Sequence, residues 1–269
     1  FSRDVASFMR LKDKVILVTG STSGIGEGMS RLFAREGARV VIHGMKLDDA
    51  QTSATELEKN GGQATAIGGD LQDPAVPARL IDEAVGKWGR LDALVNNAAA
   101  TTRGNVDNTD AAEFDRIIAI NLRAPFLLIK AALPHFRKQG GGRVINIGSI
   151  NAYCGERNLF TYSISKGALM TLTRNLADAH GVEGLRIQQF NVGWTLTKAE
   201  YEVKRKDGLP EDWPSKLPKQ NAPSGRLMSP DDIAWAAVYF LSDEAPLVNG
   251  AVLDFEQFPV IGRNPPKQI

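Results

Sequence analysis

The segment "FTYSISKGAL" at 160–169 contains one tyrosine, Tyr162, and one lysine, Lys166, four positions apart. On an α-helix this spacing is about one turn, so both side chains lie on the same face. A free phenol has a pKa of about 10, which is too high for a good base near neutrality. An ammonium about 5 Å away supplies roughly 3 kcal/mol in favour of the phenolate at an effective dielectric near 20. The pair is therefore a candidate acid/base for proton transfer. The alternative is that both side chains simply cover an exposed helix.

Seven apolar, β-branched runs have the length of strands and alternate with segments of helical length. The runs span 14–20, 39–44, 64–69, 91–98, 143–149, 185–193 and 251–255, and the helical segments span roughly 24–37, 48–60, 74–88, 110–138, 160–181 and 230–242. Strands that are apolar on both faces and joined by helices predict a parallel sheet that is covered on both sides. With right-handed crossovers, this is a Rossmann-type, doubly wound α/β fold in a single domain.

Domain boundaries and helix ends follow from the same pattern. We expect residues 1–10 to be a disordered or expression-derived tail and residues 11–269 to form the domain. Asp48, Asp110 and the pair Ser229-Pro230 suit helix starts. Residues 198–225 interrupt the rhythm with four prolines and no clear period. Such an insertion, placed after the sixth strand at the ligand-binding edge of the sheet, is predicted to be a substrate lid.

Composition excludes several classes of protein. With 32 basic and 31 acidic residues the net charge is +1, which does not favour nucleic acid or an anionic membrane as a partner. The one cysteine, Cys154, excludes an internal disulfide, so a reducing cytoplasm is the expected location. The sequence has no apolar run near the roughly 18 residues of a membrane helix. His43, His135 and His180 are too scattered to predict a metal site.

Three glycines follow the first predicted strand in "TGSTSGIG", at Gly20, Gly24 and Gly26. The first permits a tight turn, the next lets the backbone approach a pyrophosphate, and the last lets the helix pack close to the strand. The helix that follows offers free N–H groups and a partial positive charge to phosphate. This context, a buried strand before and an amphipathic helix after, predicts a dinucleotide cofactor.

The end of the second predicted strand bears on which dinucleotide binds. An acidic residue there would bind the ribose 2′-OH, but the chain has Gly44, followed by Met45 and Lys46. Without an acid nothing repels a 2′-phosphate, and Lys46 or His43 could attract one, which favours NADP over NAD. The alternative is that Lys46 is a surface lysine that opens the next helix. Asp70, after the third strand, is a candidate for the adenine amino group or for an Asx turn.

Five ordered motifs together resemble the short-chain dehydrogenase/reductase family. They are "TGSTSGIG" (19–26), "NNAA" (96–99), "NLRAPF" (121–126), "INIGSI" (145–150) and "YSISK" (162–166), and the similarity extends from about residue 11 to residue 254. The resemblance implies a catalytic tetrad of Asn121, Ser149, Tyr162 and Lys166. Ser149 would hydrogen-bond the substrate oxygen, and Asn121 would hold a water that links Lys166 to solvent. It also implies an oligomer, commonly a tetramer, packed partly through two long helices.

The chain departs from the family pattern at three places. Ala99 stands where the family usually has glycine, so its methyl could crowd the backbone beside the cofactor. Val192 replaces a proline, although Gly193 and Thr197 still match. The tail after the last strand, 255–269, replaces a glycine-rich end and could reach a neighbouring subunit or its active site.

The predicted contacts form two sets. Those for the cofactor are Gly20, Ser21, Thr22, Ser23, Gly24, Ile25, Gly26, Lys46, Asp70, Leu71, Asn97, Ala98, Tyr162, Lys166, Gly193, Thr195 and Thr197. Those for the substrate are Ser149, Asn151, Tyr153, Arg157, Tyr162, Trp194 and Trp213.

The substrate set combines polar groups with aromatic planes, which suits a small hydroxylated molecule such as a sugar, polyol or hydroxy acid. Arg157 could pair with a substrate carboxylate or with an acid on its own surface. Two other functions stay open: a 3-oxoacyl-thioester reductase, which would favour a basic patch for an acidic carrier, and a non-catalytic nucleotide sensor. A sensor would be expected to lose the tyrosine or the lysine, and both are present.

Overall fold

The computed structural model describes residues 9–153 and 155–261, and these form one seven-stranded, wholly parallel sheet. Its strands lie in the order β3 (Gln63–Gly68), β2 (Arg39–Gly44), β1 (Val15–Val18), β4 (Ala93–Asn96), β5 (Gly142–Ser149), β6 (Leu185–Val192) and β7 (Val252–Phe255). The strand order reverses between β1 and β4, so the crevice at the carboxyl ends of these strands is the expected ligand site. The Rossmann-type prediction is confirmed.

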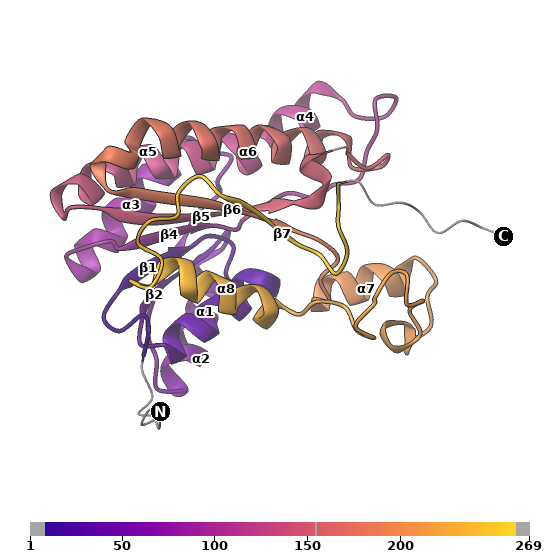
Figure 1. Ribbon diagram of the computed structural model, residues 1–269, viewed down its shortest axis with the longest axis horizontal. Helices are drawn as coiled ribbons and strands as arrows, with labels where there is room; N and C mark the ends of the chain where they lie inside the picture. The colour runs from indigo at the N-terminus through magenta and orange to yellow at the C-terminus, as the bar shows by residue number, and fades with distance from the viewer. Residues whose placement is uncertain (1–8, 154, 262–269) are drawn as a thin grey trace.

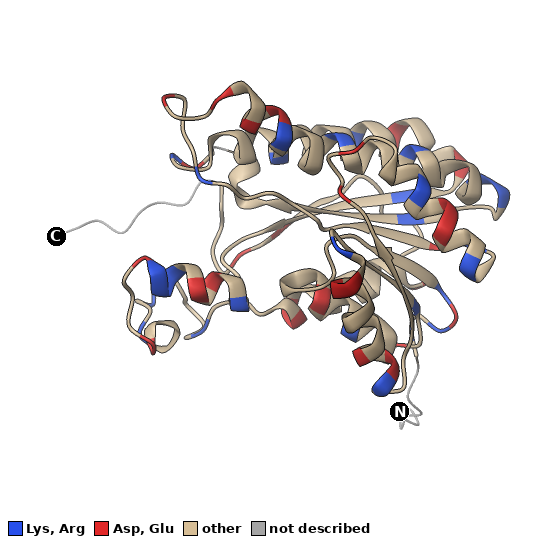
Figure 2. Cartoon of the chain, turned by 180° about the vertical axis from the view of Figure 1, so that it is seen from behind, with Lys and Arg blue, Asp and Glu red and all other residues tan. Residues whose placement is uncertain are grey.

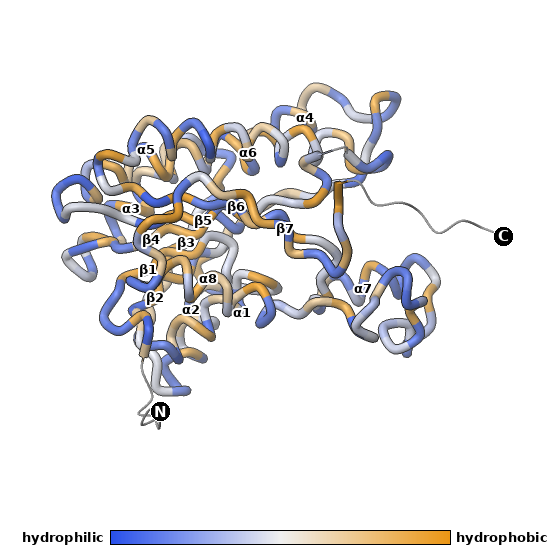
Figure 3. Tube along the Cα trace, in the orientation of Figure 1, coloured by the Kyte–Doolittle hydropathy of each residue, from blue (hydrophilic) through white to orange (hydrophobic). Residues whose placement is uncertain are grey.

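Helices cover both faces of the sheet (Figure 1). One layer holds α1 (Gly24–Arg35), α2 (Leu47–Lys59) and α8 (Pro230–Leu241), and the other holds α3 (Val76–Trp88), α5 (Ala124–Lys138) and α6 (Phe160–His180). Successive residues of β1 point to opposite layers. Ile16 belongs to the apolar cluster that contains Phe33 of α1, and Leu17 to the cluster that contains Leu128 of α5. Figure 3 shows the apolar strands at the centre and polar loops around them.

A side-chain cap begins the helix in two of the three predicted cases. The Asp110 carboxylate accepts from the Glu113 N–H at 2.8 Å and begins α4 (Ala111–Ile118). Ser229 and Asp232 form a reciprocal capping box at the start of α8. The prediction that Asp48 caps a helix is wrong, because α2 begins at Leu47 and Asp48 lies inside its first turn. A carboxylate at this place still interacts favourably with the positive end of the helix dipole.

The predicted helix over 110–138 contains a π-helical turn, η1 (Ala119–Arg123), between α4 and α5. Within the described residues, Ala111–Lys138 is the one helical span long and apolar enough to cross a membrane by length and composition, which the sequence analysis did not anticipate. Half of its most apolar window is buried in the protein, where α5 packs against α3 and the sheet. The span therefore serves as a core helix of the domain.

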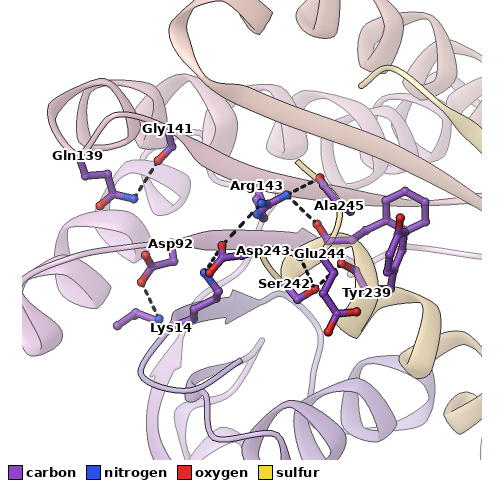
Figure 4. A network of polar contacts seen from close by, with 12 residues as sticks. Lys14, Asp92, Gln139, Gly141, Arg143, Tyr239, Ser242, Asp243, Glu244 and Ala245 are labelled. Carbon is purple, nitrogen blue, oxygen red and sulfur yellow. Dashed lines mark hydrogen bonds and ion pairs between the residues drawn. The ribbon is translucent and has the colours of Figure 1, made fainter. Parts of the chain in front are cut away.

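A polar network closes the amino-terminal edge of the sheet (Figure 4). The Lys14 ammonium contacts the Asp243 carboxylate at 2.8 Å, and the Val15 N–H donates to Asp92 at 2.9 Å. Arg143 donates to the Ala245 carbonyl at 3.0 Å. These bonds connect the starts of β1, β4 and β5 to one another and to the segment after α8. They stabilise the amino-terminal edge of the sheet, which lies opposite the predicted site.

The start of the described chain is ordered. Arg10 donates to Glu244 at 2.6 Å, and its N–H donates to Glu36 at 3.2 Å. Arg10 therefore contacts the domain, and the boundary predicted after residue 10 stays a prediction. Residues 1–8 lie outside the described residues, as do Cys154 and the end of the tail from 262.

The predicted lid contains a helix, α7 (Lys198–Lys206), which Figure 1 shows set apart from the sheet beyond the carboxyl ends of the strands. Trp213 stacks on Trp194 at a ring distance of 5.7 Å and on Tyr201 at 6.3 Å. Tyr201 and Trp213 belong to the predicted lid and Trp194 to the exit of β6, so the stacked rings hold this segment, which is rich in proline, against the end of β6.

Candidate active site

Tyr162 and Lys166 lie on the first two turns of α6, on one face, as the spacing predicts. The Lys166 ammonium lies 5.5 Å from the centre of the Tyr162 ring. Lys166 is 2% exposed and donates to the Ile147 carbonyl of β5 at 2.7 Å, while Tyr162 is half-buried. Burial lowers the pKa of Lys166 to about 8. The pair therefore belongs to the interior of the site, and the alternative of surface decoration is wrong.

In the protein without cofactor the pKa of the phenol is not lowered, so the predicted effect of Lys166 on this pKa stays a prediction. Burial raises the pKa of Tyr162 above its ordinary value, and the hydrogen bond with Ser149 opposes that rise to a smaller extent. The Ile147 carbonyl holds the Lys166 ammonium over the ring of Tyr162.

Ser149 is the last residue of β5, and its hydroxyl accepts from the Asn151 N–H at 3.2 Å. The register between β5 and β6 pairs it with Val192, so both residues lie at the carboxyl edge. The Ser149 side chain lowers the pKa of the Tyr162 hydroxyl, so these two tetrad members, one from a strand and one from a helix, lie near each other. A substrate oxygen placed between these hydroxyls would meet two possible donors.

Asn121 lies in the π-helical turn η1 and is 1% exposed. Its amide accepts from the Ala100 N–H at 2.8 Å and donates to the Ala100 carbonyl at 3.0 Å. It also donates to Ser165 at 3.0 Å, and Ser165 in turn donates to the Tyr162 carbonyl at 2.6 Å. The side chain thus fastens the loop after β4 to the first turn of α6. The predicted water at Asn121 stays a prediction.

The glycine loop has the backbone geometry that the sequence requires. Gly20 and Gly24 have φ values of +61° and +62°, in the left-handed region where side chains are strained. A Cβ on Gly26 would lie 2.5 Å from both the Asn97 amide nitrogen and the Gly20 carbonyl oxygen. Asn97 donates to the carbonyls of Thr19 and Gly20, each at 2.9 Å. Asn97 is therefore a support of the loop, fixed from β4.

The loop fits a dinucleotide. Ser23, which precedes α1, makes no side-chain bond to the first turn of the helix, so the N–H groups there stay open to an anion. Thr22, Ser23, Gly24 and Ile25 are accessible at the turn. The Ser21 hydroxyl is buried and donates to the Val18 carbonyl at 2.7 Å, so its side chain shapes the loop from within.

The end expected to receive the adenosine lies beside β2 and β3. A Cβ on Gly44 would meet the Thr22 side chain at 2.7 Å, so the backbone geometry leaves no room for an acid at this position. Lys46 is exposed, precedes α2 and forms no ion pair in the described parts of the chain. His43 is 2% exposed and bonded on both ring nitrogens, so the prediction that it could attract a 2′-phosphate is wrong.

Asp70 follows β3 at the same edge. Its oxygens accept from the Gln72 N–H at 2.9 Å and from the Gln72 amide at 3.1 Å, which makes the Asx turn that the sequence allowed. The carboxylate stays exposed, so adenine recognition there is still a prediction. Leu71 is buried, with 6% exposure, and belongs to the core beneath this loop.

The exit of β6 approaches the glycine loop. A Cβ on Gly24 would be 3.6 Å from the Thr197 methyl, so the start of the lid lies against the loop. Thr197 caps α7 by accepting from the Glu200 N–H at 3.1 Å. Thr195 is 7% exposed and bridges to Met228, so it anchors the lid to the domain.

Four further residues of interest, Ala98, Ala99, Gly193 and Asn151, lie at or near the same edge of the sheet. Ala98 lies against Gly20, where an added Cβ would be 2.9 Å from the Ala98 Cα, and Ala99 is exposed, so its methyl faces outward. A Cβ on Gly193 would lie 2.2 Å from a Glu256 carboxylate oxygen, so this side chain would have to move to admit any other residue. Asn151 is half-buried near Ser149.

Two residues predicted to contact the substrate, Trp213 and Tyr153, instead make contacts within the protein. Trp213 is 2% exposed within the stacked aromatic rings, where it cannot face an open cleft. The Tyr153 hydroxyl donates to Asp254 of β7 at 2.8 Å, and both burial and that carboxylate raise its pKa. Trp194 stays half-buried and donates to Glu200 at 2.7 Å. Arg157 is exposed and has no acidic partner in the ranges the structure describes, so its expected surface ion pair is not formed.

Sequence reasoning missed the residues that hold the rim of the site. Arg103, in the loop after β4, pairs with Asp207 at 3.1 Å and so links this loop to the lid. Gln257 of the tail accepts from the Ser224 hydroxyl at 2.6 Å and donates to the Arg226 carbonyl at 2.7 Å. The contacts join segments far apart in the chain, and no local pattern signals them.

Charges of both signs are interspersed over the chain, including the lid (Figure 2). On α7, Lys204 lies within 3.8 Å of both Glu200 and Asp207, and Arg205 lies 3.8 Å from Glu211. Two of the three basic residues at 204–206, Lys204 and Arg205, are therefore paired with nearby acids.

Comparison with known proteins agrees with this geometry. A family model described as enoyl-(acyl carrier protein) reductase matches residues 20–256. The 2-(S)-hydroxypropyl-CoM dehydrogenase 3 of Xanthobacter autotrophicus is 36% identical over 243 residues, which cover 90% of this chain and 94% of that protein. The chain belongs to the short-chain dehydrogenase/reductase family, as its motifs predicted.

Two solved structures are also similar. The 7α-hydroxysteroid dehydrogenase complexed with NADH and 7-oxo glycochenodeoxycholic acid has a TM-score of 0.84 at 32% identity, and the match covers 93% of this chain and 95% of that one. A structure from Beutenbergia cavernae with NADP bound at low occupancy has a TM-score of 0.83 at 30% identity, over 92% of this chain and 96% of that one.

Proposed function

We propose that this protein is an NAD(P)-dependent dehydrogenase that interconverts a secondary alcohol and a ketone on a small hydroxylated substrate, with Tyr162 as the general acid/base. The observation that carries the proposal is the convergence of Ser149, Tyr162 and the buried Lys166 at the carboxyl edge beside the glycine loop. The related hydroxypropyl and hydroxysteroid dehydrogenases, named for hydroxyl-bearing substrates, support it.

Each residue has a distinct task in this proposal. In the oxidative direction Tyr162 takes the proton of the substrate hydroxyl, and in the reductive direction it returns that proton. Ser149 donates to the substrate oxygen and favours the charge that develops there. When bound, the cofactor takes or supplies the hydride at its nicotinamide ring and, in its oxidised form, adds positive charge to the site. Lys166 places a positive charge beside the phenol, which favours the phenolate, and Asn121 holds the loop after β4 against α6.

The substrate is proposed to be a sugar, polyol or hydroxy acid. Arg157 supports a hydroxy acid, because it is exposed on the segment between Ser149 and Tyr162 without an acidic partner among described residues. A 3-oxoacyl-thioester reductase is the second candidate, since the matching family model is described as enoyl-(acyl carrier protein) reductase and so also concerns an acyl thioester. Two basic side chains of the lid, Lys204 and Arg205, are paired with acids on the same segment, which does not favour that candidate.

A substrate panel tests the proposal. Purified protein is assayed with NADH and NADPH against polyols, sugars, hydroxy acids and their ketones, and against a 3-oxoacyl thioester. Turnover of a small alcohol or ketone is the expected result. Turnover of the thioester alone would favour the second candidate, and no turnover with any of them would contradict the substrate class.

The cofactor preference is testable at Lys46. Replacing it by glutamate is expected to weaken NADPH binding about ten-fold relative to NADH, because one charge-assisted phosphate contact is lost and a repulsion is added. Fluorescence titration with each reduced cofactor measures this ratio. Lys59→Glu, at the other end of α2, is the control. Equal weakening for both cofactors would contradict the preference for NADP.

We further propose a cytoplasmic homotetramer. Large apolar side chains are exposed on the two long helices at Phe126 and Ile164, and on α8 at Trp235 and Tyr239. Two separate apolar faces suit two interfaces between copies of the chain. Light scattering of the intact protein is expected to give four times the chain mass.

A further inference from the structure

His43 is the next-to-last residue of β2, and its ring is buried between two loops of the site. Its Nδ1 lies 3.2 Å from the Gly20 nitrogen, and its Nε2 lies 3.0 Å from the Gly69 carbonyl oxygen. The Gly20 N–H can only donate, so Nδ1 must be the unprotonated acceptor. Nε2 therefore carries the proton and donates to Gly69. One neutral tautomer satisfies both contacts, and the protonated ring satisfies only one.

The two partners of the ring belong to the cofactor site. Gly20 opens the glycine loop, and Gly69 directly precedes Asp70 at the exit of β3. The order β3-β2-β1-β4 places His43 on one side of Gly20 and Asn97 on the other. His43 accepts from the Gly20 N–H and Asn97 donates to the Gly20 carbonyl, so both polar groups of this residue are held.

The backbone of His43 adds to this clamp. Its N–H donates to the Ser21 hydroxyl at 3.0 Å, and its carbonyl accepts from the Ser21 N–H at 2.9 Å. Burial lowers the pKa of the His43 ring, which agrees with a neutral imidazole. Loops fixed before binding lose less entropy when a ligand arrives.

We infer that His43 is a positioning residue for cofactor binding, which acts by joining the first glycine of the glycine loop to the exit of β3. The inference rests on the proposed cofactor dependence and adds a residue that the motif comparison does not include. His43 touches no reacting atom. Its loss should weaken cofactor binding and leave the chemical step with bound cofactor intact.

Three substitutions separate the two contacts. His43→Asn keeps an acceptor on Cγ for the Gly20 N–H and loses the Gly69 bond. His43→Gln keeps a donor that can reach Gly69 and loses the Gly20 acceptor. His43→Leu loses both. We expect dissociation constants for the preferred reduced cofactor to rise less than about three-fold for Asn and about ten-fold or more for Leu, because a buried backbone N–H is left unpaired in the latter.

The measurements are fluorescence titration of the intact protein, kcat at saturating cofactor, and the melting temperature. A kcat within about two-fold of wild type for the variants supports positioning, with His135→Leu as the control. Wild-type affinity in His43→Leu, or affinity losses that merely follow melting temperature across all three variants, would overturn the inference. Wild-type protein that binds neither NADH nor NADPH would instead overturn the proposed function, and this inference with it.

A measurement on the unmodified protein guards against misfolded variants. Nitrogen-15 NMR of the histidine rings is expected to show His43 as the Nε2–H tautomer near neutral pH. A ring that carries its proton on Nδ1 cannot accept from Gly20, so that spectrum would overturn the inference without any substitution.

Discussion

Tyr162→Phe is expected to lower kcat roughly 100- to 10,000-fold, the range attributed to a positioned general acid/base. The substitution removes one oxygen from a half-buried ring and leaves the ring packing in place. Cofactor affinity should stay within about three-fold, because the glycine loop is built from other elements. Steady-state kinetics in both directions, with fluorescence titration of the cofactor, measure both quantities.

A second tyrosine supplies the matched control. Tyr239 on α8 lies in the layer on the other face of the sheet from α6 and is 38% exposed. Tyr239→Phe should keep full turnover. Full turnover in Tyr162→Phe would remove the phenol from the mechanism, whereas comparable losses in both variants would point to a general effect on folding.

Lys166→Met is expected to lower kcat about 100-fold, the factor that corresponds to roughly 3 kcal/mol of interaction with a cation about 5 Å away. The same change should leave the free energy of unfolding at pH 7 within about 1 kcal/mol of wild type, because the penalty for burying the charge is removed while the bond to Ile147 is lost. Activity assays and denaturant titrations measure the two effects. A large loss of stability that parallels the loss of activity would make Lys166 a structural residue.

The contribution of Lys166 to the free energy of unfolding is expected to change with pH in a definite direction. The pKa of Lys166 falls from 10.5 in a free chain to about 8 when folded, because burial disfavours the charge. Between those values the unfolded chain holds the proton and the folded chain does not, so stability from this group rises with pH. Below about pH 8 both forms are charged, and burial opposes folding by on the order of 3 kcal/mol. Lys166→Met should lack this rise, and an identical pH slope in the variant would contradict it.

Much of the fold could be predicted from local pattern. Strands buried on both faces are continuous apolar runs, so the seven strands and their parallel arrangement follow from the sequence. Capping at Asp110 and Ser229 is likewise a local signal. The helix α7 was missed because its apolar face packs on Trp213 of the lid itself, and the four prolines nearby concealed its period.

The sequence indicates which residues gather at the candidate site, but not the contacts that set their charges. The spacing of Tyr162 and Lys166 correctly predicts one helix face, but it does not contain the Ile147 carbonyl that holds the ammonium over the ring. His43 was missed as a support because its two contacts, Gly20 and Gly69, come from separate loops. Contacts between distant segments depend on strand order, which a local motif does not encode.

The pH profile of alcohol oxidation by wild type and Tyr162→Phe tests the acid/base role of Tyr162 most directly. We expect kcat/KM of the wild type to rise with pH through one ionisation, and the residual rate of Tyr162→Phe to lack this ionisation. The same ionisation in the variant would show that another group takes the proton, and the central assignment would be wrong.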